Sequence, residues 1–101
     1  MKVDINNNTI DIKFSFRADI IFENITNKTF EGKKETDWIT YFYSNVVCKD
    51  NSISFDSFID WLDDNPNELM NFINAYMEHN KNMSVLTRKA DEVDKTPINQ
   101  D

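Results

Sequence analysis

Apolar and polar residues alternate along residues 2–14, which is the pattern of short β-strands with one buried face. The apolar positions are Val3, Ile5, Ile10, Ile12 and Phe14. The run Asn6–Asn8 interrupts them, and asparagine tolerates the left-handed backbone of a tight turn. The pattern therefore predicts an N-terminal β-hairpin.

The register of this hairpin depends on which residues form its loop. A two-residue loop at Asn7–Asn8 would put Ile5 opposite Ile10 and keep the apolar residues on one face. It would also put Asp4 opposite Asp11, which is unfavourable. We expect this register because a three-residue loop would spoil the match between apolar residues.

Four later segments carry apolar residues at helical spacing. We expect helices from about Phe16 to Ile25, from Thr36 or Asp37 to about Cys48, from Phe55 to Leu62, and from Pro66 to about Asn80. The first of these helices has one apolar stripe, made of Ala18, Ile21, Phe22 and Ile25, and a second apolar edge made of Phe16 and Ile20. Two apolar edges suggest a helix that is covered on two sides. Ser54 and Asn65 are suitable N-cap residues for the last two.

These elements predict an α+β fold that is mainly α. A lone hairpin is marginally stable in water, so we expect it to pack on the helices. The apolar pattern fades after about Asn80, and Pro97 lies near the end. We therefore expect one globular domain over residues 1–83 and a flexible, mostly disordered tail over residues 84–101.

Composition limits the kind of protein further. The chain has 101 residues, enough for one domain, and its single cysteine excludes an internal disulfide. No signal peptide and no membrane-spanning run is evident, so a reducing cytoplasm is expected. The net charge of −7 would repel nucleic acid, and we expect neither nucleic-acid nor membrane binding.

Residues that could carry chemistry are few. His79 and Cys48 lack the spacing of a zinc site, and we interpret them as a solvated residue and a half-buried one rather than as a catalytic pair. The region around Ile53 resembles the end of an EF-hand, but neither register of the loop supplies the calcium ligands. No metal, cofactor or catalytic residue is expected, and we predict that the chain is not an enzyme.

One acidic helix face allows more than one interpretation. It consists of Asp56, Asp60, Asp63 and Asp64. An acid/base pair, a metal site or a DNA-mimicking surface would each use carboxylates. The favoured interpretation is the solvated side of an amphipathic helix.

Elimination leaves protein binding as the expected function. The candidate partner-binding residues are Trp61, Met70 and Met77, which would form an apolar groove between the third and fourth helices. Methionine suits such a groove because its side chain is flexible and polarizable. Core filling is the alternative role for the two methionines.

Part of the chain resembles a known family. The segment Ile12–Phe30 is similar to the opening of tail assembly chaperones of long-tailed, siphovirus-like bacteriophages, and the Ser54–Pro66 segment fits their later pattern. The resemblance covers about residues 2–78. Asn27 stands where that family often has a glycine, and asparagine can supply the same left-handed helix cap. The matching residues in the opening are Phe14, Phe16, Arg17, Ala18, Ile20, Glu23, Ile25, Thr26, Lys28 and Phe30.

The resemblance implies a function. Such chaperones bind the tape measure protein and keep it soluble until the tail tube polymerises around it. It also implies self-association, contact with the tail tube protein through a longer frameshifted form, and a location in the cytoplasm of the infected host but not in the mature virion. The alternatives are an acidic inhibitor that mimics DNA and a small structural tail-completion protein.

Overall fold

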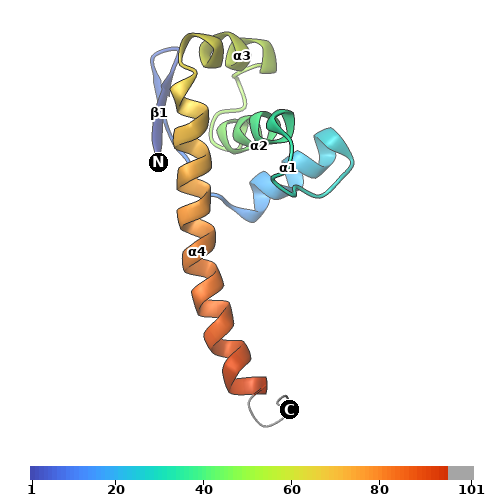
Figure 1. Ribbon diagram of the computed structural model, residues 1–101. Coiled ribbons are helices and arrows are strands. Elements are labelled where there is room, and N and C mark those ends of the chain that lie inside the picture. Colours follow the sequence, from blue (N-terminus) through green and yellow to red (C-terminus); the bar gives the residue numbers. More distant parts are fainter. Residues whose placement is uncertain (96–101) are drawn as a thin grey trace.

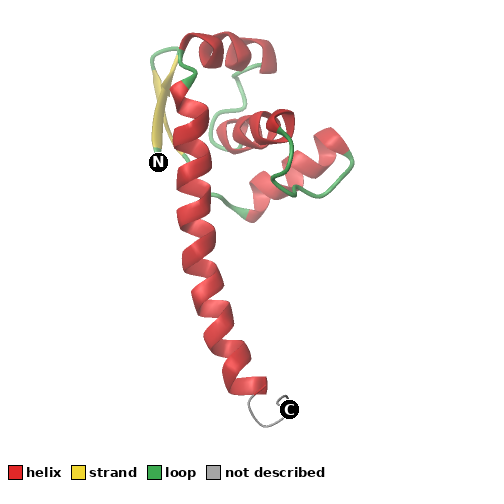
Figure 2. Cartoon of the chain, viewed as in Figure 1, coloured by secondary structure: helices red, strands yellow, loops and turns green. Residues whose placement is uncertain are grey.

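A computed structural model describes residues 1–95 of the chain, with side chains described up to Lys81; residues 96–101 lie outside the description. The structure confirms the predicted α+β, mainly α fold, with a hairpin followed by four helices (Figures 1 and 2). The elements are β1 (Lys2–Ile5), β2 (Asn8–Asp11), α1 (Phe16–Thr26), α2 (Glu35–Val47), α3 (Phe55–Asp64) and α4 (Asn67–Lys95).

The hairpin has the predicted buried face but not the predicted register. Its loop is Asn6–Asn7, and both residues have positive φ, at 52° and 69°. Val3 therefore pairs with Ile10, and Asp4 faces Thr9, whose hydroxyl donates a 2.7 Å hydrogen bond to it. The predicted loop at Asn7–Asn8 was wrong. A loop at Asn6–Asn7 keeps the apolar residues on one face and does not place Asp4 opposite Asp11.

The core is aromatic and centred on α2, which contacts both α1 and α4. The rings of Phe42 and Phe72 are fully buried and stack with centroids 4.3 Å apart. Phe58 from α3 meets the Phe42 ring edge-on at 5.1 Å. Burying each such ring contributes about 2–3 kcal/mol, so these contacts supply much of the stability of a small domain.

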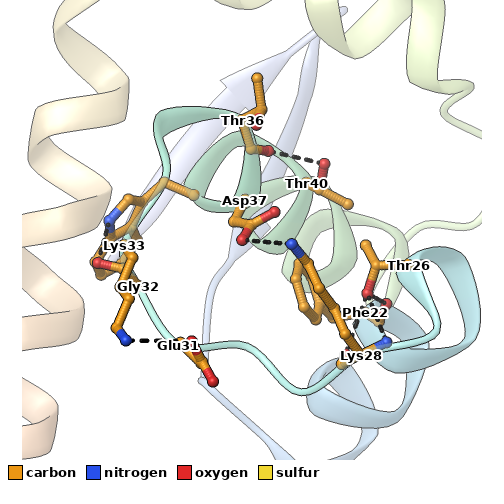
Figure 3. A network of polar contacts seen from close by, with 10 residues as sticks. Phe22, Thr26, Lys28, Glu31, Gly32, Lys33, Thr36, Asp37 and Thr40 are labelled. Carbon is orange, nitrogen blue, oxygen red and sulfur yellow. Dashed lines mark hydrogen bonds and ion pairs between the residues drawn. The ribbon is translucent and has the colours of Figure 1, made fainter.

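The connection between α1 and α2 depends on Gly32. Its φ is +69°, and its carbonyl accepts a 3.2 Å hydrogen bond from the Trp38 indole nitrogen. Lys28 reaches from this connection to Asp37 on α2, with Nζ and Oδ2 2.9 Å apart (Figure 3). These contacts fix α1 against α2.

The turn between α3 and α4 differs from the predicted capping. Ser54 caps α3 as expected, since its hydroxyl accepts from the Ser57 amide at 3.1 Å. Asn65 was expected to be the N-cap of the next helix. It is instead the C-cap of α3, where its side chain donates a hydrogen bond to the Trp61 carbonyl at 2.9 Å.

Helix α4 continues beyond the predicted end near Asn80 and reaches Lys95. No glycine or proline stands between Pro66 and Pro97 to interrupt this longer helix. The domain boundary at residue 83 and the flexible tail from residue 84 stay predictions. The helix crosses the predicted domain boundary at residue 83, and its second half extends away from the other elements (Figure 1). The rest of the predicted tail, residues 96–101, lies outside the described residues.

Candidate protein-binding surface

Helix α1 is covered on one side only. Ala18 and Phe22 are buried against the core, whereas Phe16 is 87% exposed and Ile20 is 58% exposed. The two exposed residues lie one helical turn apart, so they are neighbours on the surface. The second apolar edge of this helix, which the sequence suggested was covered, is therefore open.

Phe16 borders a shallow hollow between α1, α2 and α4. The hollow has a volume of about 190 Å³. A smaller hollow of about 120 Å³ adjoins it and shares Asp19 and Tyr76 as lining residues. The larger one is lined by Phe14, Phe16, Asp19, Tyr41, Tyr76, His79 and Asn80.

The walls of this hollow are mainly aromatic rings. Tyr76 lies 5.6 Å from Tyr41 and 5.6 Å from Phe14, measured between ring centroids. The Phe14 ring also lies 5.2 Å from the His79 ring. The two contacts of Tyr76 are edge-on and the Phe14–His79 contact is tilted. Together they restrict the orientations of the rings, so the walls are preformed.

A carboxylate lies among these rings. The Tyr41 hydroxyl donates a 2.7 Å hydrogen bond to Asp19 Oδ1. Burial, together with the hydrogen bond to Asp19, raises the pKa of Tyr41 far above its ordinary value. The pKa of Tyr76 is also raised, first by burial and then by the negative charge of Asp19. Both hydroxyl groups therefore keep their protons to a higher pH than an exposed tyrosine does.

Phe14 occupies its place at the cost of backbone strain. Its φ is +53°, in the left-handed region that bulky residues avoid. Such a conformation costs about 1–3 kcal/mol and persists only where the surroundings hold it. Contacts with Phe72, Tyr76 and His79 hold the ring, and the sharp bend lets Ser15 cap α1 by accepting from the Ala18 amide.

The three residues predicted to bind a partner are not all alike. Met70 and Met77 are 57% and 54% exposed on α4. Trp61 is partly buried and packs against Phe42 and Phe58, with centroids 5.9 Å away in each case. A hollow between α2 and the α3–α4 turn is lined by other residues. A role of these three residues in binding stays a prediction.

The residues considered for other chemistry are dispersed. Cys48 is half-buried near Ser15, with Sγ and Oγ 3.5 Å apart, while His79 packs on Phe14. Within the described part of the chain, no group of three or more histidine, cysteine or acidic side chains could hold a metal ion. Among the same residues, no helix is both long and apolar enough to cross a membrane.

Sequence reasoning missed Asp19, Tyr41 and Tyr76 as surface-forming residues. They come from three different helices, and only the folded chain brings them together. One signal was present, since the second apolar edge of α1 was visible in the sequence. The exposure of that edge could not be predicted, because the local sequence does not show which side of a helix a neighbouring element covers.

Comparison with known proteins gives one similarity. Over 84 aligned residues the chain is 27% identical to an L-cysteine desulfidase from Methanocaldococcus jannaschii. The aligned region covers 83% of this chain. The chain spans only 20% of the length of that relative. No family model matches the chain. No solved structure matches it either.

This similarity corrects two predictions. The expectation that the chain is not an enzyme is contradicted, because the named relative is an enzyme. The function of a phage tail assembly chaperone, with its alternatives of a DNA mimic or a tail-completion protein, is contradicted by the same finding. The comparisons do not bear on the phage partners or on the location that the resemblance implied, and these stay predictions.

Proposed function

We propose that this chain is a protein-binding domain that docks a segment of a partner protein on the face formed by α1 and the middle of α4. The observation that carries the proposal is the exposure of Phe16, 87%, beside a preformed aromatic hollow. A phenylalanine left in water forgoes about 2–3 kcal/mol that burial would supply. The surrounding aromatic contacts hold Phe14 in a strained backbone conformation, and such strain is often concentrated at functional sites.

The surface has the composition of a protein-binding site. Aromatic residues are enriched at interfaces, since they supply large rigid contact areas at low cost in conformational entropy. Ile20 extends the apolar area along α1, and the partly buried Tyr76 adds a hydroxyl group for orientation. Each hollow is smaller than the roughly 300–1,000 Å³ of typical small-molecule sites, which favours single side chains of a partner as occupants.

Selection from a displayed library of random peptides tests this proposal. The wild-type chain should enrich apolar peptides, and the double variant Phe16→Glu/Ile20→Glu should bind them at least about tenfold more weakly, a loss of about 1.4 kcal/mol. The matched control is Ile25→Glu, which places glutamate at another exposed position of α1. Equal loss in the control, or no enrichment with the wild type, would contradict the proposal.

The similarity to L-cysteine desulfidase favours a second candidate, that the chain has or supports L-cysteine desulfidase activity. The purified chain can be assayed with L-cysteine, beside a Cys48→Ser variant that removes the only thiol. Activity in the wild type above a protein-free control would support this candidate. Activity at the control level would count against catalysis by the chain alone.

A further inference from the structure

We propose that the hollow at Asp19 accepts the guanidinium group of an arginine from the docked segment, with the carboxylate as its partner and the surrounding rings as its walls. This inference rests on the proposed docking function and names the chemistry that the partner must bring. The lining residues that carry it are Phe14, Asp19, Tyr41 and Tyr76.

Asp19 has acceptor capacity to spare. The Tyr41 hydroxyl bonds to one oxygen, Oδ1, and a carboxylate offers about four acceptor sites in total. The carboxylate lines both hollows and is partly exposed, so a second donor can approach it. A guanidinium matches this acceptor because its parallel N–H groups can bond both oxygens of a carboxylate.

The walls favour a planar cation over a neutral group. Faces of tyrosine and phenylalanine rings attract cations, and the attraction is stronger where water is excluded. Arginine stacks on such faces and loses less hydration than lysine does. Phe14 and Tyr76 lie close enough together, 5.6 Å between centroids, to contact one bound group at once.

The surrounding charge supports the same partner. Glu23 lines the adjoining hollow one turn along α1 from Asp19, and the whole chain carries a net charge of −7. A negative surface raises the local concentration of a basic segment and disfavours an acidic one. The apolar edge of Phe16 and Ile20 would then contact residues that flank the arginine.

The test uses a small probe that does not depend on peptide selection. Nα-acetyl-arginine methylamide is titrated into the isotope-labelled full chain, and the shifts of Asp19, Tyr41 and Tyr76 are followed by nuclear magnetic resonance. The neutral control is the matching citrulline compound, which has nearly the same shape. We expect the arginine compound to bind at least about tenfold more tightly.

Two variants complete the test. Asp19→Asn keeps an oxygen for the Tyr41 hydrogen bond and should abolish the preference for arginine. Asp60→Asn removes one charge from the exposed side of α3 and should leave the preference unchanged. Equal binding of both compounds, or a preference that survives Asp19→Asn, overturns this inference. The docking proposal is judged separately by the effect of Phe16→Glu/Ile20→Glu on the selected peptides.

Discussion

The hydroxyl of Tyr41 lies 2.7 Å from Oδ1 of Asp19 and joins the buried side of α2 to the exposed side of α1. Tyr41 is 3% exposed, whereas Asp19 is partly exposed. The bond therefore links the core to the surface of the candidate site.

Alkaline pH should destabilise the fold through its tyrosines. The pKa values of Tyr41, Tyr43 and Tyr76 are raised in the folded state, mainly by burial. The folded chain keeps these protons where the unfolded chain releases them, so their contribution is complete below the ordinary value of 10.0 and is lost as pH rises above it. The free energy of unfolding in urea should fall above that pH, by up to about 1.4 kcal/mol per pH unit for one tyrosine.

The variant Tyr41→Phe tests whether the raised pKa of Tyr41 contributes to the loss of stability at alkaline pH. It removes one group whose pKa is raised, so the loss of stability with pH should become shallower. At neutral pH the variant should lose about 1–2 kcal/mol, because the hydrogen bond to the Asp19 carboxylate is gone. An identical slope in the two proteins would show that Tyr41 does not contribute.

Replacing Gly32 with alanine should destabilise the connection between α1 and α2. The backbone there has φ +69°, and an added Cβ would lie 3.1 Å from Cζ2 of Trp38. Left-handed backbone costs a residue with a side chain about 1–2 kcal/mol, and crowding of Trp38 adds to that. Urea unfolding of Gly32→Ala should show a loss of at least about 1 kcal/mol, and unchanged stability would mean that the connection adjusts freely.

Strain at Phe14 can be measured by comparing two substitutions. Phe14→Ala and Phe14→Gly both remove the ring that packs on Phe72 and Tyr76, so both should be less stable than the wild type. Glycine also relieves the positive φ, by about 1–2 kcal/mol, which exceeds its extra entropic cost of about 0.5–1 kcal/mol. Phe14→Gly should therefore be the more stable of the two by thermal melting. The opposite order would show that the backbone at this position is not strained.

The second half of α4 should contribute little to stability. The backbone of this half extends away from the other elements (Figure 1), so we expect a chain that ends after Asn82 to keep the contacts of the described core. The melting temperature should stay within a few degrees of that of the full chain. Phe72→Ala, which empties a fully buried position on the same helix, provides the contrast and should cost about 3–5 kcal/mol. A large drop in melting temperature on truncation would show that the second half of α4 stabilises the fold.

Local sequence signals predicted the elements well where one residue decides the structure. Ser54 begins α3 because its hydroxyl accepts from a backbone amide, and Asn27 ends α1 with a left-handed φ of 59°. The hairpin register was missed because two different turns bury the same apolar residues. The end of α4 was missed because the apolar pattern fades after about Asn80, although no helix-breaking residue occurs before Pro97.

The candidate site could not be predicted in the same way. Its formation depends on a positive φ at Phe14 and on the meeting of α1, α2 and α4 around Tyr41 and Tyr76. Neither is a local property of the sequence. The helical spacing of Phe16 and Ile20 shows that they share an edge, but only tertiary packing decides whether that edge is covered.

The most direct test of the docking surface is a chemical-shift map of the labelled full chain with a selected peptide bound. The docking proposal predicts that the large changes fall at Phe14–Ile20, Tyr41 and Tyr76–Asn80, and that Phe16→Glu/Ile20→Glu removes them. Trp61 and Met70, which belong to the groove expected from the sequence, should change little. Large changes at Trp61 and Met70, with none around Phe16, would contradict the proposed docking surface.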